Sequence, residues 1–274
     1  MNWLAVRVLP SGEHRAAALR ALFDAGSRAV EEVGEELRTY LPLGTDPADL
    51  IHAVVAASPG ARVETSETSI ADWASAWRDG LSVQQVGALT VAPPWLAEGL
   101  DPATTIVVDP GMAFGTGDHA TTRGVLRLLP SVVRRGDRVA DVGAGSAVLA
   151  IAAAKLGASA VAAIEIDADA IGNAEYNVRA NGVADRVAVL NGDAAVLLPL
   201  VAPVRVILAN IVAPALLGLL ETFAVALAPG GCVVVSGVSE EEGPEFSRAV
   251  EAGGWAVGDE DREERWWSAV IARR

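Results

Sequence analysis

The sequence predicts an α/β protein in which a small α+β domain precedes a doubly wound α/β domain. One observation is the regular alternation from residue 137 onward, where apolar strand-like stretches are separated by stretches with helical apolar spacing. Strands that are apolar throughout are typical of a parallel sheet covered by helices on both faces. The other observation is the different order of strand-like and helix-like stretches in residues 1–66. At 274 residues the chain is long enough for both domains.

The first 66 residues predict the order β-α-β-β-α-β, which is that of a ferredoxin-like fold. Strands are expected at residues 2–9, on either side of Gly34 within 27–42, and at 61–70. The first helix is expected at 13–26, where the helical spacing ends on a glycine. The second begins after Asp46, a capping residue followed by Pro47 at the first helical position. These residues contain no cluster of catalytic residue types, so we expect a substrate-recognition domain.

Residues 67–90 are expected to connect the two domains through a linker helix. Trp73 and Trp77 are four residues apart and fall on one helical face. Packing of that helix is the favoured interpretation of the pair, and stacking on a ligand is the alternative. Two short strands broken by prolines are expected next, at 86–96 and 104–111.

The second domain is expected over residues 91–274. Its main strands are expected at 137–143, 159–167, 185–193, 204–210 and 231–238. Helices are expected at 146–158 and 168–182, the second of which ends on Asn-Gly, and further helices of apolar period separate the later strands. The final stretch, 253–274, predicts two strands that pair as a hairpin at the edge of the sheet.

The composition excludes several classes of protein. Half of the residues are apolar and the formal net charge is −14. An acidic chain repels phosphates, so direct binding to nucleic acid is not expected; the charge favours a basic partner, or serves solubility. No run approaches the roughly 20 apolar residues of a membrane span, and the first residues lack a secretory signal pattern. Cys232 is the single cysteine and His14 and His52 fit no metal-binding pattern, so we expect a cytoplasmic protein without metal or disulfide.

The first β-to-α turn of the second domain reads D-x-G-x-G, with Gly143 and Gly145 as its glycines. A dinucleotide-binding turn has a third glycine at the position that Val148 occupies here, and no glycine-rich stretch carries the lysine of a phosphate-binding loop. The two glycines let a ligand approach the backbone closely, and nearby amides suit a carboxylate or the edge of an adenosine. The turn therefore predicts a ligand site without a pyrophosphate.

Candidate ligand-binding residues follow four successive strands of this domain, beginning with the turn of Gly143 and Gly145 after the first strand. Glu165 ends the second strand, 22 residues after Gly143, where a carboxylate accepts both ribose hydroxyls of a nucleoside. Asp193 follows the third strand and is expected either to accept the adenine amino group or to cap a helix. Asn210 ends the fourth strand. Together these residues predict a nucleoside cofactor without a pyrophosphate, namely S-adenosylmethionine.

Four stretches carry a resemblance to a known family: VDPGMAFGTGDHATT, VADVGAGSAVLAIAAAKLGA, EIDADAIGNAEYNVRANGV and LANIVAP. They resemble the methyltransferases that modify ribosomal large-subunit protein eleven, the PrmA family, from about residue 70 to the end. The resemblance implies a seven-stranded class I methyltransferase domain that uses S-adenosylmethionine. It also implies methylation of lysine side chains and of the N-terminal amine of a basic ribosomal protein, which the first domain grips, and it implies a monomer.

The resemblance assigns cofactor contacts to Thr122, Gly143, Glu165 and Asn210, and it places Phe114 and His119 along the site. The sequence departs from the family pattern at three informative positions. Ala147 stands at the usual third glycine of the first turn, Glu165 at the usual aspartate, and Asp118 where threonine is more frequent.

The implied chemistry is attack of an amine nitrogen on the methyl carbon of a sulfonium. We expect Asn210 and the backbone carbonyl of Ile211 to align the amine, which must first lose a proton. His119 is a candidate base, and a structural hydrogen-bonding role is its alternative. Two further interpretations stay open: a methyltransferase of another protein or of a small amine, and a regulator that binds S-adenosylmethionine without catalysis.

Overall fold

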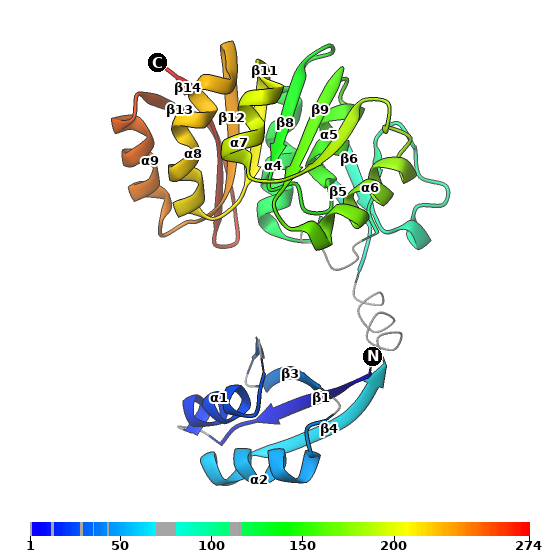
Figure 1. Cartoon of the computed structure of the whole chain (residues 1–274), viewed down its shortest axis with the longest axis vertical. Helices are drawn as coiled ribbons and strands as arrows, with labels where there is room; N and C mark the ends of the chain where they lie inside the picture. The colour runs from blue at the N-terminus through cyan, green and yellow to red at the C-terminus, as the bar shows by residue number, and fades with distance from the viewer. Residues whose placement is uncertain are drawn as a thin grey trace. The chain divides into compact units, whose positions relative to one another are not determined.

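The computed structural model describes residues 2–11, 14–27, 30–34, 36–42, 44–69, 81–109, 115 and 117–274. Contacts within the chain divide it into two units, Met1–Leu81 and Ser82–Arg274, and Figure 1 shows their elements. The predicted linker helix with Trp73 and Trp77 lies outside the described residues. The last strand of the first unit ends at Ser69, beyond the expected boundary at 66, and the second unit begins earlier than the expected residue 91.

The first unit has the expected order of elements. These are β1 (Asn2–Leu9), α1 (Arg15–Asp24), β2 (Glu31–Val33), β3 (Glu36–Pro42), α2 (Pro47–Ala57) and β4 (Arg62–Ser69). The strands form one antiparallel sheet in the order β2-β3-β1-β4. Asp46 caps α2 as predicted, because its carboxylate accepts a hydrogen bond of 2.8 Å from the amide of Ala48. Apolar residues of both helices pack against the sheet in a core of their own.

The second unit starts with a small sheet of three strands. They are β5 (Gln84–Val86), β6 (Leu89–Ala92) and β7 (Thr105–Val107), in the order β5-β6-β7. The strand predicted at 86–96 is found as β6 but is shorter than expected, because a turn at Gly87 separates it from β5 and the prolines begin a short 3₁₀ helix, η2 (Pro94–Leu96). This sheet adds Val86, Leu89 and Ile106 to the core of the second unit.

The large sheet has seven strands in the order β10-β9-β8-β11-β12-β14-β13. Their bounds are β8 (Arg138–Val142), β9 (Ala160–Glu165), β10 (Val187–Asn191), β11 (Val204–Asn210), β12 (Leu227–Ser239), β13 (Trp255–Glu263) and β14 (Trp266–Arg273). The strands from β10 to β12 are parallel, while β14 and β13 are antiparallel to their neighbours and form the predicted edge hairpin. The predicted doubly wound α/β class is confirmed for this unit.

Helices cover both faces of the large sheet (Figure 1). One face carries α4 (Ala120–Val132), α5 (Val148–Lys155) and α6 (Ala168–Ala180), and the other carries α7 (Ala194–Val201), α8 (Ala213–Ala226) and α9 (Gly243–Ala252). Neighbouring strands β8 and β11 are therefore followed by helices on opposite faces, α5 and α8. In parallel sheets the ends of two such strands leave a crevice that binds ligands. Within the described part of the chain, no helix has the length and apolarity required to cross a membrane.

Candidate active site

The site residues predicted at four strand ends lie on neighbouring strands. Gly143 follows β8, Glu165 ends β9, Asp193 follows β10 and Asn210 ends β11, and these strands are adjacent in the order β10-β9-β8-β11. Since parallel strands end at the same edge, the sheet brings all four to one crevice. The segments 141–148, 165–169, 191–195 and 210–213 contain no lysine or arginine. The edge therefore suits a neutral or cationic ligand better than a phosphate.

The turn between β8 and α5 uses its glycines for backbone geometry. Gly143 has a φ of 72°, and a Cβ there would lie 2.5 Å from the Cγ2 atom of Ile211. Among the amides expected to suit a ligand, those of the two glycines donate within the protein. The amide of Gly143 donates to the carbonyl of Ile164 at 2.9 Å, and that of Gly145 donates to the Glu165 carboxylate at 2.8 Å. What the turn offers a ligand is close approach to the backbone.

Glu165 is fixed by backbone amides and is 8% exposed. Its Oε2 accepts from Gly145, and its Oε1 accepts from the amide of Asp167 at 2.9 Å. A carboxylate oxygen has two acceptor sites, so each oxygen keeps one for a ligand. The next residue, Ile166, is 70% exposed. Sequence reasoning missed this apolar side chain; its signal was an isoleucine directly after the acidic strand end.

Asp141 lies beneath this edge and is fully buried. Its Oδ2 accepts from the amide of Ala150 at 2.9 Å, whereas its Oδ1 has no hydrogen-bond partner among the residues that the structure describes. Burial raises the pKa of Asp141 to about 7; the Ala150 amide opposes this shift and the charge of Glu165 adds to it. The carboxyl of Asp141 is therefore part protonated near neutral pH.

Asp193 and Asp167 both cap helices. Asp193 accepts from the amide of Ala195 at 2.8 Å and caps α7, and Asp167 accepts from the amide of Asp169 at 2.9 Å and caps α6. For Asp193, capping was one of the two roles predicted. The cap uses its Oδ1 atom, so the second oxygen remains a candidate for contact with a ligand.

A cavity of about 310 Å³ lies beside the end of β11. We call it the Asn210 pocket; its walls are His119, Thr121, Asn210, Ile211, Val212, Gly237 and Trp266. The amide nitrogen of Asn210 donates to the hydroxyl of Thr122 at 3.4 Å. The carbonyl oxygen of Asn210 is thereby left as its acceptor towards the pocket. Thr122 is fully buried and does not line the pocket, so any effect it has on a ligand passes through Asn210.

The backbone carbonyl of Ile211 is held by a close approach of β12. Gly237 has a φ of 84° at an irregularity in the pairing of β12 with β14. A Cβ at Gly237 would overlap the carbonyl group of Ile211, so the strand passes this close only with glycine. Asn210 and Ile211 both line the pocket, and their carbonyl oxygens are its candidate acceptors.

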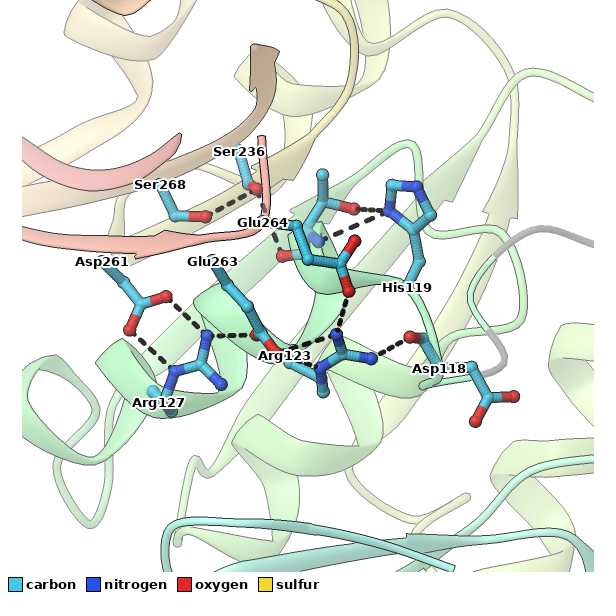
Figure 2. Close-up of polar contacts among 10 residues, drawn as sticks. Asp118, His119, Arg123, Arg127, Ser236, Asp261, Glu263, Glu264 and Ser268 are labelled. Atoms are coloured by element: carbon cyan, nitrogen blue, oxygen red, sulfur yellow. Dashed lines mark hydrogen bonds and ion pairs between the residues drawn. The ribbon is translucent and has the colours of Figure 1, made fainter. Parts of the chain in front are cut away.

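His119 is the N-cap of α4. Its Nδ1 accepts from the amide of Thr121 and lies 2.7 Å from the Thr121 hydroxyl (Figure 2). Burial lowers the pKa of His119; the charge of Glu264 opposes this shift and that of Arg123 adds to it. The imidazole is therefore neutral at pH 7. In the tautomer that caps the helix, Nε2 carries the hydrogen and does not accept a proton, which favours the structural alternative.

A set of asparagines anchors the chain that leads into the glycine-rich stretch. Asn177 of α6 bonds the backbone amide and carbonyl of Asp109, at 2.8 and 3.1 Å. Asn181, the residue that ends α6, bonds the same two groups of Val107, at 2.9 and 2.6 Å. Asn173 donates to the Asp109 carbonyl at 2.9 Å. Sequence reasoning missed these contacts, whose signal is the four-residue spacing in NAEYNVRAN. Phe114, the predicted cover of the site, lies outside the described residues.

Comparison with known proteins gives a consistent result. Residues 6–274 match the family of ribosomal protein L11 methyltransferases (PrmA). A ribosomal protein L11 methyltransferase from Pelotomaculum thermopropionicum is 41% identical over 249 residues, which cover 90% of this chain and 75% of that protein.

Solved structures agree. The crystal structure of a ribosomal protein L11 methylase from Lactobacillus delbrueckii subsp. bulgaricus has a TM-score of 0.63 and 32% identity, covering 71% of this chain and 100% of that one. A putative methyltransferase complexed with SAH shares the fold, with a TM-score of 0.50 and 14% identity over 57% of this chain and 50% of that one.

Proposed function

The chain belongs to the ribosomal protein L11 methyltransferase family, and we propose that it transfers methyl groups from S-adenosylmethionine to amines of ribosomal protein L11. The observation that supports this proposal is the Asn210 pocket, whose lining combines two candidate acceptors, the carbonyl oxygens of Asn210 and Ile211, with apolar side chains at the edge of the strand ends. Such a pocket suits an aliphatic amine. Lysine side chains and the N-terminal amine are the proposed acceptors.

The strand-end edge is the proposed site for S-adenosylmethionine. Glu165 keeps two acceptor positions, which match the two ribose hydroxyls, and the second oxygen of Asp193 suits the adenine amino group. The exposed Ile166 offers an apolar surface to the adenine ring. The turn at Gly143 and Gly145 permits close approach. The lack of basic residues along this edge favours a sulfonium cofactor over a phosphorylated one.

When bound, the cofactor supplies a methyl group on a positively charged sulfur, which an amine nitrogen attacks. The carbonyl oxygens of Asn210 and Ile211 accept the hydrogens of the neutral amine and direct its lone pair. Thr122 fixes the Asn210 amide. The apolar walls formed by Val212 and Trp266 disfavour a charged amine and so lower its pKa from the reference value of about 10.4.

The first unit is proposed to recognise the substrate protein. It has its own core, and the chain carries a formal charge of −14 that favours a basic ribosomal protein. His119 is proposed to cap α4 and to form part of the pocket wall, and not to act as a base. The contact assigned to Phe114 stays a prediction.

The test is incubation with labelled S-adenosylmethionine and purified ribosomal protein L11, followed by mass spectrometry of the product. We expect label on lysine and N-terminal amines. Asn210→Ala should lower the transfer rate by about 100-fold, since a positioned acceptor is lost, while calorimetry shows cofactor affinity within about threefold. If the protein binds the cofactor but transfers no methyl group, the regulator is favoured. If label appears only on an amine of a molecule other than L11, a different substrate is favoured.

A further inference from the structure

Two arginines of α4 connect this helix to the β13–β14 hairpin (Figure 2). Arg127 contacts Asp261 at 2.6 and 2.7 Å and Glu263 at 2.6 Å. Arg123, one turn earlier, contacts Glu263 at 2.8 Å and Glu264 at 3.2 Å. Arg123 also donates to the backbone carbonyl of Asp118, in the loop before α4. Of the two arginines, Arg123 is the one whose described contacts join the hairpin to the loop that carries His119.

Glu264 lies at the tip of the hairpin in a strained conformation. Its φ is 56°, and Ala147 is the one other non-glycine residue with positive φ in the described part of the chain. The tip has two residues between the paired Glu263 and Trp266, and positive φ at the first of them is the pattern of a type II′ turn, where glycine is preferred. The side chain is 66% exposed, so its ion pair adds little to stability. A strained residue with a weak stabilising role points to function.

The hairpin tip leads directly to the wall of the Asn210 pocket. Trp266 follows Glu264 by two residues, and its ring lies 5.1 Å from the ring of His119 in an edge contact. Both rings line the pocket. Arg123 therefore lies between two segments that each supply one wall: the hairpin, with Trp266, and the loop, with His119. The Arg123 side chain itself is only 15% exposed, although its partner Glu264 is exposed.

We propose that Glu264 is a positioning residue for the acceptor amine: through Arg123 it holds the hairpin tip against the Asp118–His119 loop and sets the width of the Asn210 pocket. This inference rests on the proposed function, because it takes the pocket to be the acceptor site. The pair of Glu264 and Arg123 lies on the exposed side of the hairpin, since the Glu264 side chain is 66% exposed. Deeper in, the Ser236 hydroxyl donates to the Thr121 carbonyl at 3.1 Å and lies 2.7 Å from the Ser268 hydroxyl, so α4 stays fixed without Glu264.

The discriminating variant is Glu264→Gly, because glycine suits the turn and removes the carboxylate. We expect an unchanged or higher Tm, a KM for ribosomal protein L11 raised by about threefold or more, and a cofactor Kd within about twofold. Arg123→Met should raise that KM further. Arg127→Met is the matched control: it breaks ion pairs to the same hairpin without reaching the loop, so it should lower Tm and leave KM within about twofold.

Amide hydrogen exchange of the peptide covering residues 117–123 gives a readout that does not depend on transfer. Exchange should become faster in Glu264→Gly and Arg123→Met, and stay as in the natural protein in Arg127→Met. Unchanged KM and unchanged exchange in Glu264→Gly would overturn the inference. If Glu264→Gly loses stability, Glu264→Gln, which keeps the backbone, replaces it under the same criteria. If the natural protein does not methylate L11, the proposed function fails, and exchange alone decides the inference.

Discussion

At the scale of single residues, His119 has two competing roles, and its tautomer separates them. Its Nδ1 caps α4 through the Thr121 amide, and that tautomer leaves no acceptor at Nε2. Asparagine is also a good helix cap. We therefore expect His119→Asn to keep the Tm and to lose less than about tenfold in kcat, whereas loss of a general base costs about 100-fold or more. A loss of that larger size, with an altered acid limb of the pH–rate profile, would restore the base role.

Asp141 predicts a pH dependence of stability. Burial raises its pKa in the folded protein to about 7, far above the ordinary value of a solvated aspartate. Between about pH 4 and 7 the folded state therefore holds a proton that the unfolded chain has lost. The bound proton of Asp141 therefore contributes to the free energy of unfolding. This contribution is complete below about pH 4 and is lost as the pH rises through 7, and its magnitude is on the order of 4 kcal/mol.

Urea unfolding from pH 4 to 8, without cofactor, measures this effect. Asp141→Asn keeps the shape and an acceptor for the Ala150 amide but cannot ionise. We expect the free energy of unfolding of the natural protein to fall relative to that of the variant as the pH rises from 4 to 7, and the difference to level off above that. Parallel curves for the two proteins would contradict the raised pKa.

At the scale of elements, the turn between β8 and α5 contains a residue that its conformation disfavours. Ala147 precedes α5 with a φ of 65°, where glycine is preferred by about 1–2 kcal/mol. The resemblance implies that glycine is usual at this position, and glycine suits this conformation. We expect Ala147→Gly to stabilise the protein by about 0.5–1 kcal/mol, after the greater flexibility of glycine in the unfolded chain is subtracted. Urea unfolding measures this difference.

Ala144, in the same turn, is the matched control. It is not among the residues with positive φ, so Ala144→Gly gains no relief and should destabilise the protein by about 0.5–1 kcal/mol. Equal effects of the two substitutions would show that the conformation at Ala147 does not carry strain. Cofactor affinity, measured beside stability, reports whether the turn also changes its contact with the ligand.

The elements and the strand-end residues were predictable because they depend on local pattern and on one rule of parallel sheets. Apolar strands alternating with helices predict the doubly wound sheet, and the sheet then gathers Glu165 and Asn210 at one edge. The contacts between distant segments were not predictable. Asn181 bonds Val107 across 74 residues, and Arg123 pairs with Glu263 across 140. No local pattern encodes which side chain meets which backbone group at such separations.

At the scale of the whole molecule, the structure changes how the role of the first unit is tested. The boundary expected at residue 66 would cut through β4, which runs to Ser69. The contacts divide the chain after Leu81 instead. The second unit contains both cores that cover the large sheet, and the first unit has a separate core. A variant that begins at Ser82 should therefore fold on its own.

We expect the Ser82 variant to bind S-adenosylmethionine with a Kd within about threefold of that of the full chain, because Glu165 and Asp193 both lie in the second unit. Its kcat/KM for intact ribosomal protein L11 should fall by about 100-fold or more, since the binding energy of the docking unit is lost. Its kcat/KM for a short lysine peptide should match that of the full chain, because such a peptide reaches the Asn210 pocket without docking. Circular dichroism and cofactor binding verify the fold. Undiminished methylation of intact L11 by this variant would assign substrate recognition to the second unit alone.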